Sequence, residues 1–301
     1  MTQNELLEYL QIAPEKVVWP IGLGGYGHSI FTFHNIRISH GFGFEVEEAA
    51  RDLLKIKPYP FQSIAEIDQY FSERPFDFSL LDDELEAIRK DADADTVVFG
   101  GSFGPLTVTS DIFGMYNTLI MSRKKPKLLK RVLQHVMKFM GELAKQEVEA
   151  GAELFWIAEP VASLFSPASL RELCFEEYQE FFSDLPVCGC LHVCGNTDPH
   201  NLLFEEMGAG MISIDYLTDI KKCLETVSDQ TIVMGNMSPI LLRDGCFEEI
   251  REASLQLMRD IENYPNTIVS SGCMICPGTK AENIECWVET CKERKLVRWQ
   301  Q

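Results

Sequence analysis

The sequence predicts an α/β protein whose parallel sheet is built from consecutive βα units. Short apolar runs rich in β-branched residues alternate with longer segments of helical periodicity along most of the chain. This alternation is typical of parallel strands joined by covering helices. Seven runs have strand character. An eighth, either before residue 95 or near Val297, would complete a closed barrel, and we expect one domain over residues 1–301.

The predicted strands are short and apolar, as buried parallel strands are. They are Val17–Ile21, Thr96–Phe99, Leu154–Ala158, Val187–His192, Met211–Ile214, Thr231–Met234 and Thr267–Ser270. The predicted helices have apolar residues three or four positions apart. They are Lys127–Ala150, Ser169–Ser183, Asn201–Met207, Asp219–Thr226, Phe247–Asn263 and Ala281–Arg294.

Residues 1–95 are less regular than the βα repeats of residues 96–301. A hairpin is expected at Ile30–Ser39, and the acidic run Asp82–Asp95 indicates a solvated helix with its exit loop. Within residues 1–95, we expect the irregular excursion over residues 22–95 to cap one mouth of the barrel. The sequence does not say which mouth.

The charge of the chain argues against two classes of partner. Lys and Arg total 27 against 46 Asp and Glu, a net charge of −19, which would repel nucleic acid and anionic membrane surfaces. No apolar run reaches the ~18 residues of a membrane span, and the first ten residues lack the basic start of a signal peptide. We therefore expect a cytoplasmic protein whose ten cysteines are packing residues and metal ligands.

Polar residues follow five of the predicted strands. In a parallel barrel the carboxyl ends of all strands open on one face, so these residues converge on one pocket. They are Glu159, His192 with Cys194, Asp215, Asn236, and Cys273.

Imidazole and thiolate are the ligands that zinc prefers, and three protein ligands with an open fourth position are typical of catalytic zinc. His192, Cys194 and Cys273 are therefore the predicted metal ligands and catalytic residues. Glu159 is a candidate fourth ligand or proton acceptor, with a strand-end salt bridge to a helix as the alternative.

Asp215 and Asn236 are expected to position the substrate or cofactor, or to orient His192 through its second ring nitrogen. The alternative is that they satisfy loop amides. The glycine run that ends at Gly104 follows a strand, and its backbone is expected to contact the substrate or cofactor.

The remaining cysteines leave two alternatives open. Cys276 lies three residues after Cys273 and would convert the site into a closed structural zinc site if it were a fourth ligand. Cys188 and Cys190 share a strand face with His192 and are expected to be core residues.

Several motifs resemble the uroporphyrinogen decarboxylase superfamily, over roughly residues 95–290. Within it, the chain resembles the zinc-dependent methyltransferases that act with corrinoid proteins, such as methylcobamide:coenzyme M methyltransferases and related methyl-ether demethylating enzymes. The motifs are Gly104-Pro105-Leu106-Thr107, Glu149–Glu153, Ala158-Glu159-Pro160, His192-Val193-Cys194-Gly195, Gly235-Asn236 with Pro239, Ser271-Gly272-Cys273, Pro277-Gly278-Thr279 and Glu282-Asn283.

The resemblance implies a (β/α)8 TIM-type barrel with zinc on His192, Cys194 and Cys273. It also implies a corrinoid cofactor (a methylcobamide) on a partner protein, and a small-molecule methyl donor or acceptor such as a thiol, ether or amine. Decarboxylases of the superfamily begin with an arginine-rich segment that binds porphyrin carboxylates, and this chain has only the isolated Lys16 and Arg37 there. Decarboxylation of a carboxylated tetrapyrrole is therefore the second hypothesis, and a non-catalytic binding module the third.

Overall fold

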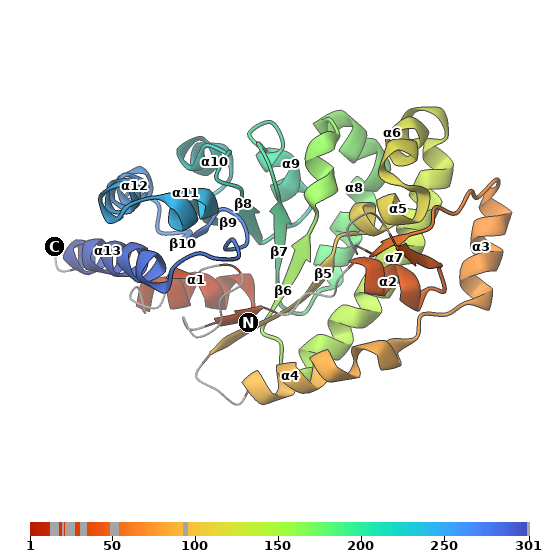
Figure 1. Ribbon diagram of the computed structural model, residues 1–301, viewed down its shortest axis with the longest axis horizontal. Helices are drawn as coiled ribbons and strands as arrows, with labels where there is room; N and C mark the ends of the chain where they lie inside the picture. Colours follow the sequence, from red (N-terminus) through yellow and green to blue (C-terminus); the bar gives the residue numbers. More distant parts are fainter. Residues whose placement is uncertain are drawn as a thin grey trace.

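The central feature of the fold is an eight-stranded parallel sheet in the order β1-β10-β9-β8-β7-β6-β5-β2. The structure is a computed structural model that describes residues 1–12, 18–19, 21, 28–30, 35–48, 54–92 and 96–299. Figure 1 shows the strands surrounded by the helices of the later βα units. The strands are β1 (Val18–Trp19), β2 (His28–Ile30), β5 (Val97–Phe103), β6 (Leu154–Ala158), β7 (Cys188–Val193), β8 (Met211–Ile214), β9 (Ile232–Met237) and β10 (Thr267–Ser271).

This strand order is that of a (β/α)8 barrel. Neighbours in the sheet follow chain order from β2 to β10, and β1 pairs in parallel with β10. The two edge strands, β1 and β2, follow each other in the chain, as the first two strands of a closed barrel do. Among the described residues they are not hydrogen-bonded to each other. All seven predicted strands are present, and β2, which pairs with β5, is the eighth strand expected before residue 95.

Helices connect the strands and cover the outer face of the sheet. The predicted ones occur within a few residues of their expected bounds, apart from the longer last helix. In the part of the chain described, no helix is both long and apolar enough to cross a bilayer. The helices are α1 (Gln3–Ile12), α2 (Asn35–Gly41), α3 (Ile64–Glu73), α4 (Asp82–Ala92), α5 (Pro105–Phe113), α6 (Met115–Lys124), α7 (Pro126–Ala150), α8 (Pro167–Asp184), α9 (Asn201–Glu206), α10 (Ile220–Thr226), α11 (Pro239–Asp244), α12 (Phe247–Asp260) and α13 (Ala281–Trp299), with short 3-10 turns η3 (Phe78–Leu81) and η4 (Pro160–Leu164).

The hairpin predicted at Ile30–Ser39 is wrong, because β2 is a barrel strand and α2 begins at Asn35. Ile38 and Phe42 are both buried and lie four residues apart, which is a helical spacing. The chain forms a hairpin later, where β3 (Val46–Glu48) pairs antiparallel with β4 (Leu54–Ile56).

Helix α5 was missed by the sequence prediction for a different reason. Eight of its nine residues are buried, so it lacks the polar face that makes an amphipathic helix visible in a sequence. Pro105 occupies its first turn, a position that proline favours.

Side chains alternate across the strands and form two apolar clusters. On β6, Phe155 and Ile157 pack outward against the helices, whereas Leu154 and Trp156 belong to the barrel interior. The interior cluster takes alternate residues from most of the barrel strands. It contains Leu6, Leu10, Trp19, Ile21, Val97, Phe99, Leu154, Trp156, Cys188, Cys190, Met211, Ile232, Met234 and Ile268.

Helix α1 closes the amino-terminal end of the barrel. Its Leu6 and Leu10 are buried in the interior cluster, and the amide of Cys188, at the start of β7, donates to the Met1 carbonyl at 2.9 Å. Figure 1 shows α1 at the end of the strands away from the loops that lead into α9 and α10. Helix α1, which precedes the excursion over residues 22–95, thus closes the mouth opposite the strand-end residues, and capping by the excursion itself stays a prediction.

Replacing Leu6 by alanine should destabilise the fold. Leu6 is fully buried, so Leu6→Ala leaves a cavity under the barrel and is expected to lower the free energy of unfolding by about 2–5 kcal/mol, measured by urea denaturation. Leu202→Ala is the matched control, because Leu202 is 47% exposed. Equal stability of the Leu6→Ala variant and the control would show that α1 does not seal the barrel.

Candidate metal centre

Three metal-binding side chains from two strands meet at the carboxyl end of the barrel. His192 lies on β7, Cys194 follows that strand directly, and Cys273 follows β10. One ligand atom from each lies within 4.8 Å of the others. Nε2 of His192 is 3.5 Å from Sγ of Cys194, which is 3.7 Å from Sγ of Cys273. Residues 79 positions apart in the chain thus share one site, as expected for residues that follow parallel strands of one barrel.

Two interior neighbours fix the ring of His192. Trp156 stacks on it with the ring centroids 5.3 Å apart, and the Ser213 hydroxyl contacts Nδ1 at 3.0 Å. Nε2 is therefore the nitrogen that faces Cys194. The predicted orienting role of Asp215 or Asn236 is wrong, because Ser213 pairs with His192 in the register of β7 and β8 and so lies nearer to the ring.

A close backbone approach places Cys273. A Cβ on Gly272 would lie 2.2 Å from the Tyr216 nitrogen, so only glycine allows β10 to pack this tightly on the loop after β8. The Gly272 amide donates to the Met237 carbonyl at 2.7 Å. The position of Cys273 is therefore set by the loops that follow β8 and β9.

The two thiols differ in acidity. The hydrogen bond from the Cys194 thiol lowers the pKa of Cys273 to about 4, and the hydrogen bond from His192 is the second-largest cause of this shift. The same contact with Cys273, together with burial, raises the pKa of Cys194 well above its usual range. Of the two thiols, Cys273 is therefore the one whose ionisation these contacts favour.

Asp215 and Asn236 form part of the wall beside this site. The Asp215 carboxylate accepts from the Leu217 amide at 2.9 Å, and the Asn236 amide donates to the carbonyls of Asp215 and Thr218. Both satisfy loop groups, which was the alternative interpretation of these residues. Their contact with a substrate or cofactor stays a prediction.

Glu159 lies outside the group of three ligands. Ala158 pairs with His192 in the register of β6 and β7, and the residue after Ala158 points to the opposite face of the sheet. The structure thus directs the Glu159 side chain away from the barrel interior, and it does not bring Glu159 to the metal ligands.

The Glu159 carboxylate binds the start of α5 instead. It accepts from the amides of Leu106 and Thr107 at 2.9 and 2.7 Å, from the Thr107 hydroxyl, and from the Tyr178 hydroxyl at 2.8 Å. Gly104 makes this possible, because a Cβ there would lie 2.1 Å from the carboxylate. Burial raises the pKa of Glu159 to about 7, although these hydrogen bonds oppose the shift. A ligand-binding role for the Gly104 backbone stays a prediction.

The other cysteines near the site do not join the ligands. Among the described residues, the group of possible metal ligands contains His192, Cys194 and Cys273 alone, so Cys276 does not complete a closed four-ligand site. Cys188 and Cys190 lie deeper in the barrel, within the apolar interior cluster.

The donor set fits zinc. It offers two sulfurs and one imidazole nitrogen, of which the nitrogen is held in place by a hydroxyl on the other side of the ring. Zinc sites of this kind use such a contact to fix the ring and its tautomer. Three protein ligands leave one position of a tetrahedral ion for a reactant.

Comparisons with known proteins agree with this architecture. The family model described as Uroporphyrinogen decarboxylase (URO-D) matches residues 18–294. Methylcobamide:CoM methyltransferase MtaA from Methanosarcina barkeri is 29% identical over 212 residues, which are 68% of this chain and 60% of that protein. The match thus spans less than two thirds of that relative. A uroporphyrinogen decarboxylase from Prochlorococcus marinus is 25% identical over 83% of this chain and 74% of its own length.

A solved structure supports the fold. A methyltransferase from Methanosarcina mazei superposes with a TM-score of 0.75 at 24% sequence identity, covering 97% of this chain and 86% of the other. At this level of identity the likeness concerns the fold alone.

Glu159 should make stability depend on pH. Its pKa rises from an ordinary 4.5 to about 7 in the folded protein, so its contribution is fully present below about pH 4.5 and is lost as the pH rises through about 7. Relative to Glu159→Gln, the metal-free parent should lose up to about 3 kcal/mol more between pH 5 and pH 8, measured by urea denaturation. Glu248→Gln, at an exposed position, should behave like the parent. Equal losses in the parent and in Glu159→Gln would show that this carboxyl does not titrate in that range.

Proposed function

Because this chain belongs to the uroporphyrinogen decarboxylase family, we propose that it is a zinc-dependent methyltransferase. It moves a methyl group between a corrinoid on a partner protein and a small thiol or a methylated ether or amine. The observation that carries this proposal is the meeting of His192, Cys194 and Cys273 at the open end of the barrel. The similarity to a protein named Methylcobamide:CoM methyltransferase supports the choice of reaction.

The three ligands would hold the ion through Nε2 of His192 and the sulfurs of Cys194 and Cys273. When bound, zinc supplies Lewis acidity, which lowers the pKa of a substrate thiol or withdraws electrons from a methyl ether or amine. Two thiolates and a neutral imidazole balance the charge of the dication. This neutrality leaves a substrate sulfur at the fourth position electron-rich and nucleophilic.

The barrel interior below the ligands is apolar. Trp156, Cys190, Met211 and Met234 pack there, so the floor of the site is largely apolar beside the Ser213 hydroxyl that contacts His192. Electrostatic effects are stronger in such a surrounding than in water. The corrinoid on the partner would supply the cobalt chemistry, and this chain would supply the metal ligands and the orientation of the reactants.

Decarboxylation of a tetrapyrrole is the second candidate, because the uroporphyrinogen decarboxylase relative matches more of this chain than the methyltransferase does. The N-terminal part gives it little support. Arg37 is bound to the Glu84 carboxylate and the Leu80 carbonyl, which leaves its guanidinium occupied. The net charge of −19 also disfavours a polyanionic substrate.

We also propose that the protein works in the cytoplasm as a single domain. The ten cysteines form no disulfide in the structure, which suits a reducing compartment, and the family match extends over nearly the whole chain.

The metal proposal predicts about one zinc per chain, measured by elemental mass spectrometry of the purified protein. His192→Ala and Cys273→Ala should each lose the zinc and the demethylation of methylcobalamin by thiols, because two ligands do not retain the ion. Their far-ultraviolet circular dichroism should match that of the parent.

Cys276→Ala is the matched control, because this cysteine lies in the same loop but outside the ligand group. It should keep both zinc and turnover. Zinc content and turnover unchanged in both ligand variants would contradict the proposal. Release of carbon dioxide from a porphyrinogen by the metal-free protein would establish the second candidate instead.

A further inference from the structure

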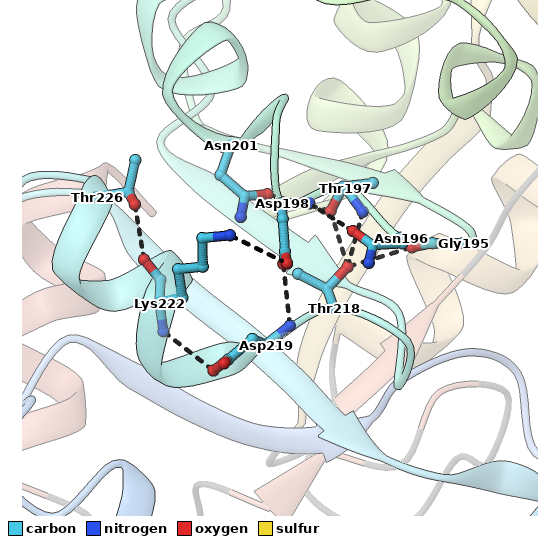
Figure 2. Close-up of polar contacts among 9 residues, drawn as sticks. All are labelled: Gly195, Asn196, Thr197, Asp198, Asn201, Thr218, Asp219, Lys222 and Thr226. Atoms are coloured by element: carbon cyan, nitrogen blue, oxygen red, sulfur yellow. Dashed lines mark hydrogen bonds and ion pairs between the residues drawn. The ribbon is translucent and has the colours of Figure 1, made fainter.

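Strand β8 and the loop after it touch the segments that carry all three proposed ligands. Ser213, on β8, contacts His192, and Gly272, next to Cys273, packs against Tyr216. The remaining ligand, Cys194, is followed by a turn that reaches the same loop at Thr218. Figure 2 shows the side chain of Thr218 between this turn and the start of α10.

The Thr218 hydroxyl binds the turn after Cys194 at three points. Its oxygen accepts from the Thr197 amide at 2.9 Å, lies 3.2 Å from the Gly195 carbonyl and is 3.0 Å from the Thr197 hydroxyl. The hydroxyl donates its one proton to either the carbonyl or the second hydroxyl. Thr218 and Thr197 are 3% and 1% exposed, so water does not replace these contacts.

The turn needs such a restraint because of its backbone. Gly195, directly after Cys194, has a φ of 89°, a region that glycine enters freely and leaves as freely. Without a contact from another segment, rotation of the backbone at Gly195 would move the Cys194 sulfur. Strand β7 holds the residues before Cys194, and the Thr218 hydroxyl holds Gly195 and Thr197 after it.

Thr218 is itself fixed. Its amide donates to the Asp215 carbonyl at 3.0 Å, and its carbonyl accepts from the Asn236 amide at 2.7 Å. A second link runs nearer the surface, where the Asp198 carboxylate accepts from the Asp219 amide at 3.1 Å and from Lys222 at 3.4 Å. Figure 2 shows both links between the two loops. Thr218 therefore transmits the position of β8 and β9 to the turn.

We propose that Thr218 is a positioning residue for the metal site, which holds the Cys194 sulfur at its place among the three ligands. This inference rests on the proposed function as far as the metal is concerned. It assigns Thr218 no contact with a reactant. Its effect is on how tightly, and in what geometry, the three ligands bind an ion.

The test compares Thr218→Val, which keeps the shape and removes the hydroxyl, with Thr218→Ser, which keeps the hydroxyl. Thr290→Val is the matched control, because Thr290 is 2% exposed and its hydroxyl bonds only within α13. Zn²⁺ affinity is measured by chelator competition, and site geometry by the absorption spectrum of the Co²⁺-substituted protein. Thr218→Val should bind Zn²⁺ about 10- to 100-fold more weakly than the parent with an altered Co²⁺ spectrum. Thr218→Ser and Thr290→Val should resemble the parent.

A second measurement needs no metal. Hydrogen exchange of the Thr197 amide in the metal-free protein should be faster in Thr218→Val than in Thr290→Val, because that amide loses its acceptor. If Thr218→Val does not fold, Thr197→Val serves in its place. It removes the contact between the two hydroxyls, keeps the amide contact, and should weaken Zn²⁺ binding less.

Equal Zn²⁺ affinity and an unchanged Co²⁺ spectrum in Thr218→Val would overturn the inference and leave the proposed function intact. A parent protein that binds no Zn²⁺ would overturn the proposed function. In that case hydrogen exchange decides the role of Thr218: faster exchange of the Thr197 amide supports it, and unchanged exchange overturns it.

Discussion

The alternation of side chains across parallel strands decides which strand-end residues meet. On β7 the alternation turns His192 into the barrel interior beside Trp156. On β6 it turns Glu159 outward, although Glu159 follows a residue paired with His192. A change of one position in register would exchange these two outcomes. The same acid, directed away from the candidate metal ligands, thereby becomes an anchor for the first turn of α5.

Most of the barrel could be predicted from the sequence because its strands are short, apolar and regularly spaced. Much of the N-terminal part could not, and β2 is an example, because it spans three residues, too few for a periodic signal. Helix α5 escaped prediction because burial on nearly every side removes its amphipathic pattern. An element could therefore be predicted when it was long enough to repeat its pattern and when one of its faces was exposed.

The three ligands were predictable because histidine and cysteine at strand ends are chemically distinctive. The residues that hold them were not. Ser213 and Thr218 are common small polar residues. Ser213 contacts His192 because of the register of β8 against β7, and Thr218 contacts the turn after Cys194 from the loop after β8, and a single sequence displays neither contact. Glu159 was misplaced for a related reason, although counting alternate positions along β6 from Leu154 would have placed it on the outer face.

The closure of the amino-terminal end of the barrel by α1 has a consequence for how reactants enter and leave the site. With Leu6 and Leu10 filling the amino-terminal end, a reactant has to reach the ligands through the carboxyl-terminal opening. In the proposed function, a small molecule and a macromolecular methyl carrier would both reach the candidate ligands from this end, and the docked carrier would block entry of the small molecule. Under that proposal the small reactant would enter first, and its product would leave only after the carrier dissociates.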